Sequence, residues 1–82
     1  MMMTAEQLRA ARALLRWEQK QLSHASGVPI PTIRRLEGGS GPVRATYENV
    51  AKLLEALEAA GVIFIQSNGD GPGVRLKKGP QS

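Results

Sequence analysis

The sequence is poor in the residues that build covalent or metal-linked structure, and in aromatic side chains. It contains no cysteine, one histidine, and one residue each of Trp, Tyr and Phe. Disulfide bonds and thiolate zinc sites are therefore excluded, which fits a reducing cytoplasm. No apolar run approaches the roughly 20 residues that a membrane span needs, and residues 1–6 lack the apolar core of a signal peptide. We expect a cytoplasmic protein that does not enter a membrane.

Groups that could carry out catalysis are also scarce. The one histidine, His24, is expected on the outer face of a helix, and no carboxylates cluster near it. Gly69, Gly71 and Gly73 resemble a glycine-rich phosphate loop only superficially, because no helix start follows them to receive the phosphate. A hairpin turn explains these glycines better. We expect a protein that is not an enzyme and that has no cofactor and no metal site.

The size and charge of the chain favour a small binding module. Its 82 residues, 41% of them hydrophobic, are enough for one core but not for a substrate cavity as well. Eleven Lys and Arg against seven Asp and Glu give a formal charge of +4. This excess favours a polyanionic partner, although Lys77 and Lys78 lie in a Gly/Pro-rich tail where they can simply be solvated. Charge alone leaves the partner open.

The first two helices are marked by their ends. Thr4 and Gln7 form a capping box, and the apolar stripe after them predicts a helix that runs to about residue 15. A second helix is predicted over residues 18–26. Gly27 ends it, because glycine is free to adopt the left-handed conformation that reverses the chain. Two apolar side chains of this second helix are expected in the core, those of Leu22 and Ala25.

The third and fourth helices begin in different ways. Pro29 and Pro31 bias the residues before them away from helical angles, so Pro31 is expected to be the first residue of the third helix. Thr46 caps the fourth and longest helix, and Gly61 ends it. The core stripe of this helix is predicted to contain Tyr47, Val50, Leu54 and Leu57, with Leu53 at its margin.

Residues 62–76 are predicted to form a β-hairpin, and residues 77–82 a flexible tail. The first strand is apolar on both faces, whereas the helices can cover only one of them. An exposed apolar strand invites pairing with another chain. We therefore predict a homodimer whose interface includes this strand; the alternative is a hairpin folded wholly onto its own helices. The interface residues would be Val62, Ile63, Phe64 and Ile65.

Residues 19–37 carry a specific pattern: a Gln that opens one helix, Leu three residues later, a small residue, Gly at a turn, Val after it, Ile in the next helix and a final Glu. These positions are Gln19, Leu22, Ser23, Gly27, Val28, Ile33 and Glu37. In this pattern the chain resembles the XRE, or Cro-like, helix-turn-helix family. The resemblance implies a mainly α protein, with a four-helix Cro/phage-repressor-like domain over residues 1–61 followed by the C-terminal β-hairpin. It also implies that Arg12 pairs with Glu37.

The resemblance further implies how DNA would be bound. In this family the Gln that opens the second helix touches backbone phosphate, and the start of the third helix reads base edges in the major groove. The chain would then be a dimeric bacterial repressor on double-stranded DNA with an inverted repeat. Ordinary solubilising charges are the alternative for the arginines. The DNA-binding residues would be Gln19, Thr32, Arg34, Arg35 and, in the loop after the third helix, Arg44.

The chain departs from the family pattern on the surface that would face DNA. Glu18 stands where the family usually has Ser or Thr, so it places a negative charge near the expected phosphate. Pro29, Ile30 and Pro31 replace the helix cap and the polar readers of bases. Such an apolar tip suits a protein partner at least as well as a thymine methyl. The alternative function is therefore an antiactivator that binds another transcription factor through these three residues or through the edge of the hairpin; an antitoxin would combine both kinds of binding.

Overall fold

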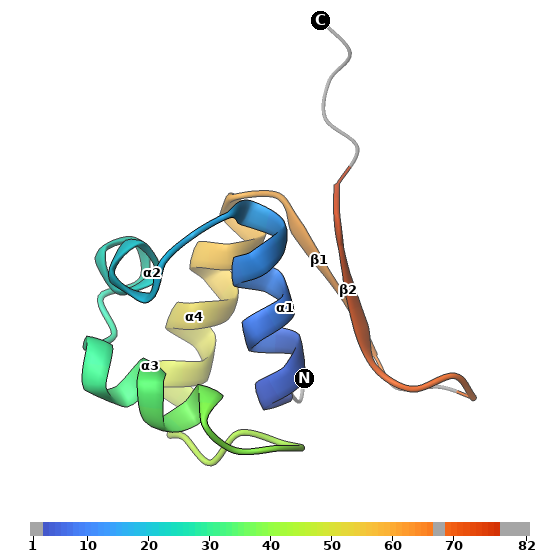
Figure 1. The fold of residues 1–82 in the computed structure, drawn as a ribbon, viewed down its shortest axis with the longest axis horizontal. Coiled ribbons are helices and arrows are strands. Elements are labelled where there is room, and N and C mark those ends of the chain that lie inside the picture. The colour runs from blue at the N-terminus through green and yellow to red at the C-terminus, as the bar shows by residue number, and fades with distance from the viewer. Residues whose placement is uncertain (1–2, 67–68, 78–82) are drawn as a thin grey trace, which may run out of the picture.

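The computed structural model describes residues 3–66 and 69–77. Four helices are followed by a two-stranded antiparallel hairpin, so the chain is mainly helical as predicted (Figure 1). Within the described residues, no helix combines the length and the apolar character needed to cross a membrane. The elements are α1 (Ala5–Leu15), α2 (Gln19–Ser26), α3 (Ile30–Glu37), α4 (Tyr47–Ala59), β1 (Val62–Ile65) and β2 (Gly73–Leu76).

The helix ends follow the sequence signals closely. The Gln7 N–H donates to Thr4 Oγ1 at 3.0 Å and the Thr4 N–H donates to Gln7 Oε1 at 2.9 Å, which completes the predicted capping box. Gly27 ends α2 with a φ of 81°, in the left-handed region. α3 begins one residue earlier than predicted, at Ile30. Pro31 lies inside its first turn, where the N–H that proline lacks would have no helical partner.

The core lies between the helices and one face of the hairpin, and two residues of α4 differ from the prediction. Leu53 is fully buried at the centre of the α4 face rather than at its margin, whereas Tyr47 is 88% exposed. At about 100° per residue, Tyr47 points about 100° away from the midpoint between Leu53 and Leu57. The buried hydrophobic residues are Met3, Ala5, Leu8, Ala11, Leu22, Val28, Ile33, Leu36, Leu53, Leu57, Val62 and Phe64.

The prediction that Ala25 faces the core is wrong. Of the residues in α2, Leu22 is buried, while Ala25 is exposed. Ala25 lies on the flank of the helix that borders an open groove of about 570 Å³, whose other lining residues are Trp17, Lys20, Gln21 and His24. The half-buried Trp17 packs against the core from this side. α2 therefore contributes one large side chain to the core and leaves its outer face open.

The hairpin pairs within the chain and packs one face on α1 and α4. Val62 and Phe64 are buried, and Ile63 and Ile65 lie half-buried on the opposite face, because successive strand residues alternate between faces. The Gln7 Nε2 donates to the carbonyl oxygens of Ile65 at 3.1 Å and of Gly73 at 2.9 Å, which ties α1 to the end of the hairpin where the two strands meet the turn.

Of the predicted flexible tail, residues 77–82, the structure describes only Lys77. The Lys77 N–H donates to Gly61 O at 2.6 Å, next to the last strand pair of the hairpin, Val62 and Leu76. Residues 78–82, the rest of that predicted tail, lie outside the described residues.

Candidate nucleic-acid interface

The helix-turn-helix unit is held by apolar contacts and closed by hydroxyl groups. Its α2 and α3 pack against each other, and Leu22, Val28, Ile33 and Leu36 are buried. In the turn, the Ser23 Oγ donates to Val28 O at 2.6 Å and the Val28 N–H donates to Ser26 Oγ at 3.1 Å. Buried backbone groups of the turn thus have partners, which fixes the orientation of α3 relative to α2.

A carboxylate at the end of α3 joins three helices. Glu37, which is 4% exposed, accepts hydrogen bonds from Arg12 Nε at 2.6 Å and Arg12 Nη2 at 2.7 Å, forming the pair that the family resemblance implies. The Gln19 Nε2 donates to the same carboxylate at 3.0 Å. Burial opposes ionisation, but the hydrogen bonds from Arg12 and Gln19 hold the pKa of Glu37 below its ordinary value. The carboxylate also raises the pKa of Arg12.

Gln19 is therefore only partly available to a ligand. The side chain is half-buried, and one of its two N–H donors is directed to Glu37. The amide group retains a second donor that can bind phosphate. The residue that caps α2, Glu18, is also exposed, and its N–H already donates to Gln21 Oε1 at 2.6 Å. The entry to α2 thus combines one candidate phosphate donor with a negative charge.

The exposed face of α3 carries the arginines predicted to read bases. Arg34 and Arg35 are exposed, and Thr32 is half-buried. The Arg35 Nη1 donates to the backbone oxygen of Arg44 at 3.2 Å, so the structure brings these two predicted contacts together. At the start of the helix, Pro29 and Pro31 are exposed and Ile30 is half-buried. α3 therefore presents an apolar leading end and a basic flank.

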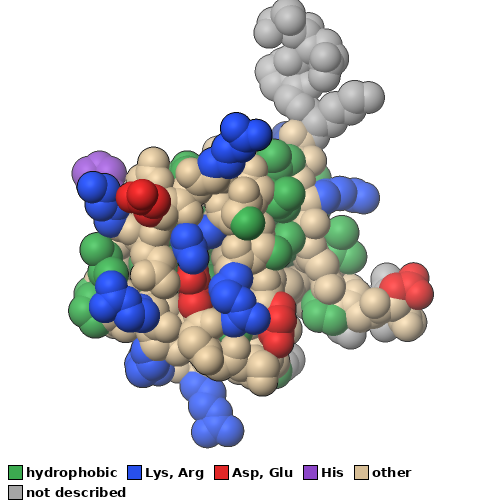
Figure 2. Space-filling view, in the orientation of Figure 1, with side chains coloured by type: hydrophobic (Ala, Val, Ile, Leu, Met, Phe, Trp, Pro, Cys, Tyr) green, Lys and Arg blue, Asp and Glu red, His purple; other side chains and the backbone are tan. Residues whose placement is uncertain are grey.

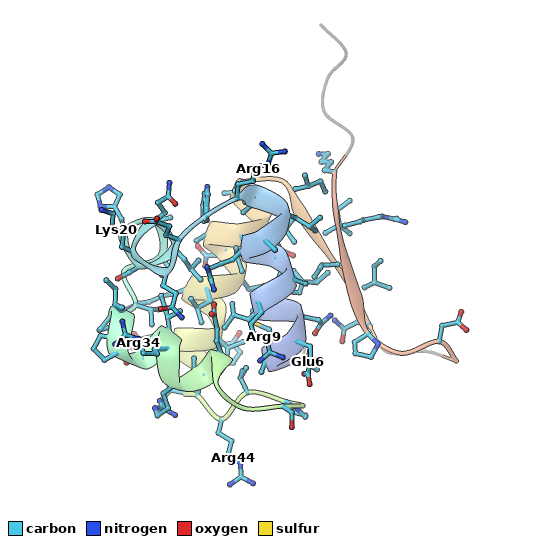
Figure 3. All side chains as sticks on the ribbon, viewed as in Figure 1. Glu6, Arg9, Arg16, Lys20, Arg34 and Arg44 are labelled. Carbon is cyan, nitrogen blue, oxygen red and sulfur yellow. The ribbon has the colours of Figure 1, made fainter. Side chains whose placement is uncertain are left out.

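The net positive charge is confined to the half of the chain that contains this unit. Residues 1–46 contain seven Lys and Arg against three Glu, whereas residues 47–82 contain four basic and four acidic residues. Figure 2 shows Lys and Arg side chains spread over the face formed by α1, α2 and α3. In Figure 3, the labelled basic residues on this side come from α1, α2, α3 and the loop after α3: Arg9, Arg16, Lys20, Arg34 and Arg44.

Two contacts of α1 were missed by the sequence interpretation. The Arg9 Nη1 donates to Glu37 O and, at 3.0 Å, to Gly39 O. Glu6 Oε1 accepts from the Gly41 N–H at 3.0 Å, and the hydrogen bonds from its own N–H and from that of Gly41 lower the pKa of Glu6. Apart from the charges themselves, no sequence signal marks these bonds, because their partners are backbone groups at the end of α3 and in the glycine-rich loop after it.

Comparison with known protein families found a match that covers most of the four helices. Residues 8–60 match the family model described as helix-turn-helix, of the Cro/C1 type, and this range runs from within α1 to the end of α4. The matching family is one of regulatory DNA-binding domains rather than of enzymes. A search among curated proteins found no match. The chain therefore belongs to the Cro/C1-type, or XRE, family of DNA-binding helix-turn-helix transcriptional regulators.

Proposed function

We propose that the protein is a sequence-specific transcriptional repressor that binds an inverted repeat in double-stranded DNA as a homodimer. The observation that carries the proposal is the basic flank of α3, where Arg34 and Arg35 are exposed on a helix whose inner side is fixed by the core. Guanidinium groups match guanine edges through two parallel hydrogen bonds. A regulator of this kind works where chromosomal DNA lies, which we take to be the cytoplasm of a bacterial cell.

The contacts divide by role. Gln19 at the start of α2 and Arg44 after α3 would bind phosphates and set the orientation of the protein. Thr32, Arg34 and Arg35 would reach base edges. In the free protein Arg35 already donates to Arg44 O, so a bidentate contact with guanine requires the guanidinium to exchange that bond. At a base that offers Arg35 no matching acceptors, the loss of the bond to Arg44 O would not be compensated. This difference favours discrimination between DNA sites.

The dimer would use the outer face of β1. Val62 and Phe64 pack in the core of their own chain and cannot also serve a partner, which leaves Ile63 and Ile65 for the interface. A second copy covering these side chains removes apolar surface from water. To bind both halves of an operator, such a dimer would need its two copies of α3 about 34 Å apart, one turn of DNA.

A binding titration tests this proposal. The DNA is the region upstream of the protein's own gene, labelled with a fluorophore and measured by anisotropy at several salt concentrations. We expect the affinity to fall steeply with salt, and Arg35→Ala to weaken specific binding by about 1–3 kcal/mol. Lys52→Ala, which removes an exposed basic residue of α4, is the control and should change binding little. Salt-insensitive or absent binding by the unaltered protein would refute the repressor.

The apolar leading end of α3 favours a second candidate, an antiactivator. Pro29 and Pro31 are exposed where base readers would lie, and the exposed Glu18 repels phosphate. In this case the protein would inhibit another transcription factor by binding it through Pro29, Ile30 and Pro31. Ile30→Asp should abolish the complex with that factor while the thermal unfolding of the free protein stays close to normal. Tight operator binding with no such complex would exclude the antiactivator.

A further inference from the structure

Arg9 links the first helix to the end of the recognition helix through backbone atoms. Its guanidinium donates to the carbonyl oxygen of Glu37, the last residue of α3, and to that of Gly39 in the following loop. In Figure 3 the Arg9 side chain lies between α1 and α3, beside Glu6. The bond therefore reaches the point where α3 ends and the loop that carries Arg44 begins.

The same loop is fixed at a second point by the start of the chain. Its Gly41 N–H donates to the carboxylate of Glu6, one turn before Arg9 on α1. Backbone contacts hold it as well: Ala5 N–H donates to Gly41 O at 2.9 Å, Val43 N–H donates to Met3 O at 2.9 Å, and Thr4 pairs with Pro42. The loop thus lies along the N-terminal segment rather than free in solvent.

The composition of the loop explains why such anchoring matters. Gly38, Gly39 and Gly41 lie between α3 and Arg44, and glycine loses more conformational freedom on ordering than any other residue. Gly41 adopts a φ of 71°, in the left-handed region. An unanchored loop of this kind would sample many positions of Arg44, and DNA binding would then have to supply the ordering.

The geometry points to Arg9 as a positioning residue of the DNA interface, which orders the loop so that Arg44 faces phosphate before DNA arrives. This inference rests on the proposed DNA binding. The Arg9 Nη1 is directed to two carbonyl oxygens of its own chain, whereas a direct contact of Arg9 with phosphate would act independently of Arg44. Removal of Arg9 should thus weaken binding through Arg44, and should have no further effect when the Arg44 side chain is absent.

A double-mutant cycle tests this dependence. Arg9→Met, Arg44→Met and the double variant are titrated against the same DNA fragment, with Arg16→Met as the matched control. Arg16 is another exposed arginine at the end of α1, so this control removes an equal charge from the same helix. We expect Arg9→Met to weaken binding about tenfold in the natural background and to have almost no effect beside Arg44→Met. Arg16→Met should have the same effect in both backgrounds.

Additive effects of Arg9→Met and Arg44→Met would overturn the inference, since they would mean that Arg9 acts independently of Arg44. An effect of Arg9→Met no larger than that of Arg16→Met would also overturn it, while leaving DNA binding intact. If the unaltered protein does not bind DNA, both the proposed function and this role of Arg9 fail.

Hydrogen exchange in the absence of DNA separates these failures. The Gly41 and Val43 amides, which donate to Glu6 and Met3, should exchange about tenfold faster in Arg9→Met at equal global stability. In Arg16→Met their rates should stay unchanged. Unchanged rates in Arg9→Met would show that Arg9 does not order the loop, whatever the protein binds.

Discussion

Arg12 and Glu37 meet side by side although 25 residues separate them, with both carboxylate oxygens accepting from the one guanidinium. The carboxylate is 4% exposed and the guanidinium side chain 21% exposed. Charge pairs of this kind are costly to break by removing one partner, because the other charge stays buried without compensation. This pair joins α1 to the end of α3, so it links the stability of the fold to the position of the recognition helix.

Removal of one member of this pair should destabilise the protein more than removal of both. We expect Arg12→Met to lower the free energy of unfolding by about 3 kcal/mol, and Arg12→Met with Glu37→Met to recover part of that loss. Urea unfolding followed by circular dichroism measures both. A double variant less stable than Arg12→Met would contradict the argument.

The ionisation of Glu37 should make stability depend on pH in acid. Its folded-state pKa lies below the ordinary value of 4.5, so its contribution is complete above pH 4.5 and is lost as the pH falls through the folded-state pKa. Urea unfolding between about pH 6 and pH 3 should show a steeper loss of stability for the natural protein than for Glu37→Gln. Glu6 titrates in both proteins, so it does not account for the difference. Parallel pH profiles would mean that Glu37 is not stabilised as a carboxylate.

The two faces of β1 should respond in opposite ways to a charge. Ile63→Lys and Ile65→Lys place the charge on the outer face and should yield a folded monomer, because they disrupt the proposed dimer interface. Val62→Lys places it in the core and should lower the melting temperature sharply, since the ammonium group would be buried without a partner. Sedimentation velocity and thermal unfolding separate these outcomes. A natural protein that sediments as a monomer, or an unchanged mass for both isoleucine variants, would rule out this interface.

The turn between α2 and α3 has room for a methyl group at Gly27, but its backbone conformation disfavours any residue other than glycine. A Cβ at Gly27 would meet no atom within 4 Å, yet the φ of 81° strains any other L-residue. Gly27→Ala should therefore cost about 1–2 kcal/mol in the free energy of unfolding. Gly39→Ala is the control, because that position is equally open and its φ is not in the left-handed region. Equal effects of the two variants would show that the backbone of the turn is not constrained.

The sequence predicted the parts of the fold that depend on local chemistry. The capping box of Thr4 and Gln7 and the left-handed Gly27 follow from the preferences of single residues for helix ends, and the structure contains them. The Cro-like pattern placed α2 and α3, and the family match supports it. These features are readable because each depends on neighbours within a few positions of the chain.

Other features could not be predicted from the sequence because they depend on which distant segment packs against a helix. Tyr47 repeats at helical spacing with Leu54, but only the tertiary arrangement decides which side of α4 is covered. Arg9 binds backbone carbonyl oxygens nearly 30 residues away, and backbone atoms leave no signature in a sequence pattern. The sequence also could not assign a ligand to the arginines on α3, because exposure alone does not identify what a side chain binds.

The buried side-chain amide of Gln7 links the hairpin to the helical part of the fold. Gln7 is 2% exposed, and its oxygen completes the start of α1 while its nitrogen bonds to both strands. A chain shortened to residue 61 would leave the Gln7 amide donor without its two partners. It would also expose the part of the core that Val62 and Phe64 cover. The hairpin therefore cannot be exchanged freely between related regulators. A chimera joined at residue 61 would need a residue at position 7 that can bond to the backbone of the new C-terminal segment.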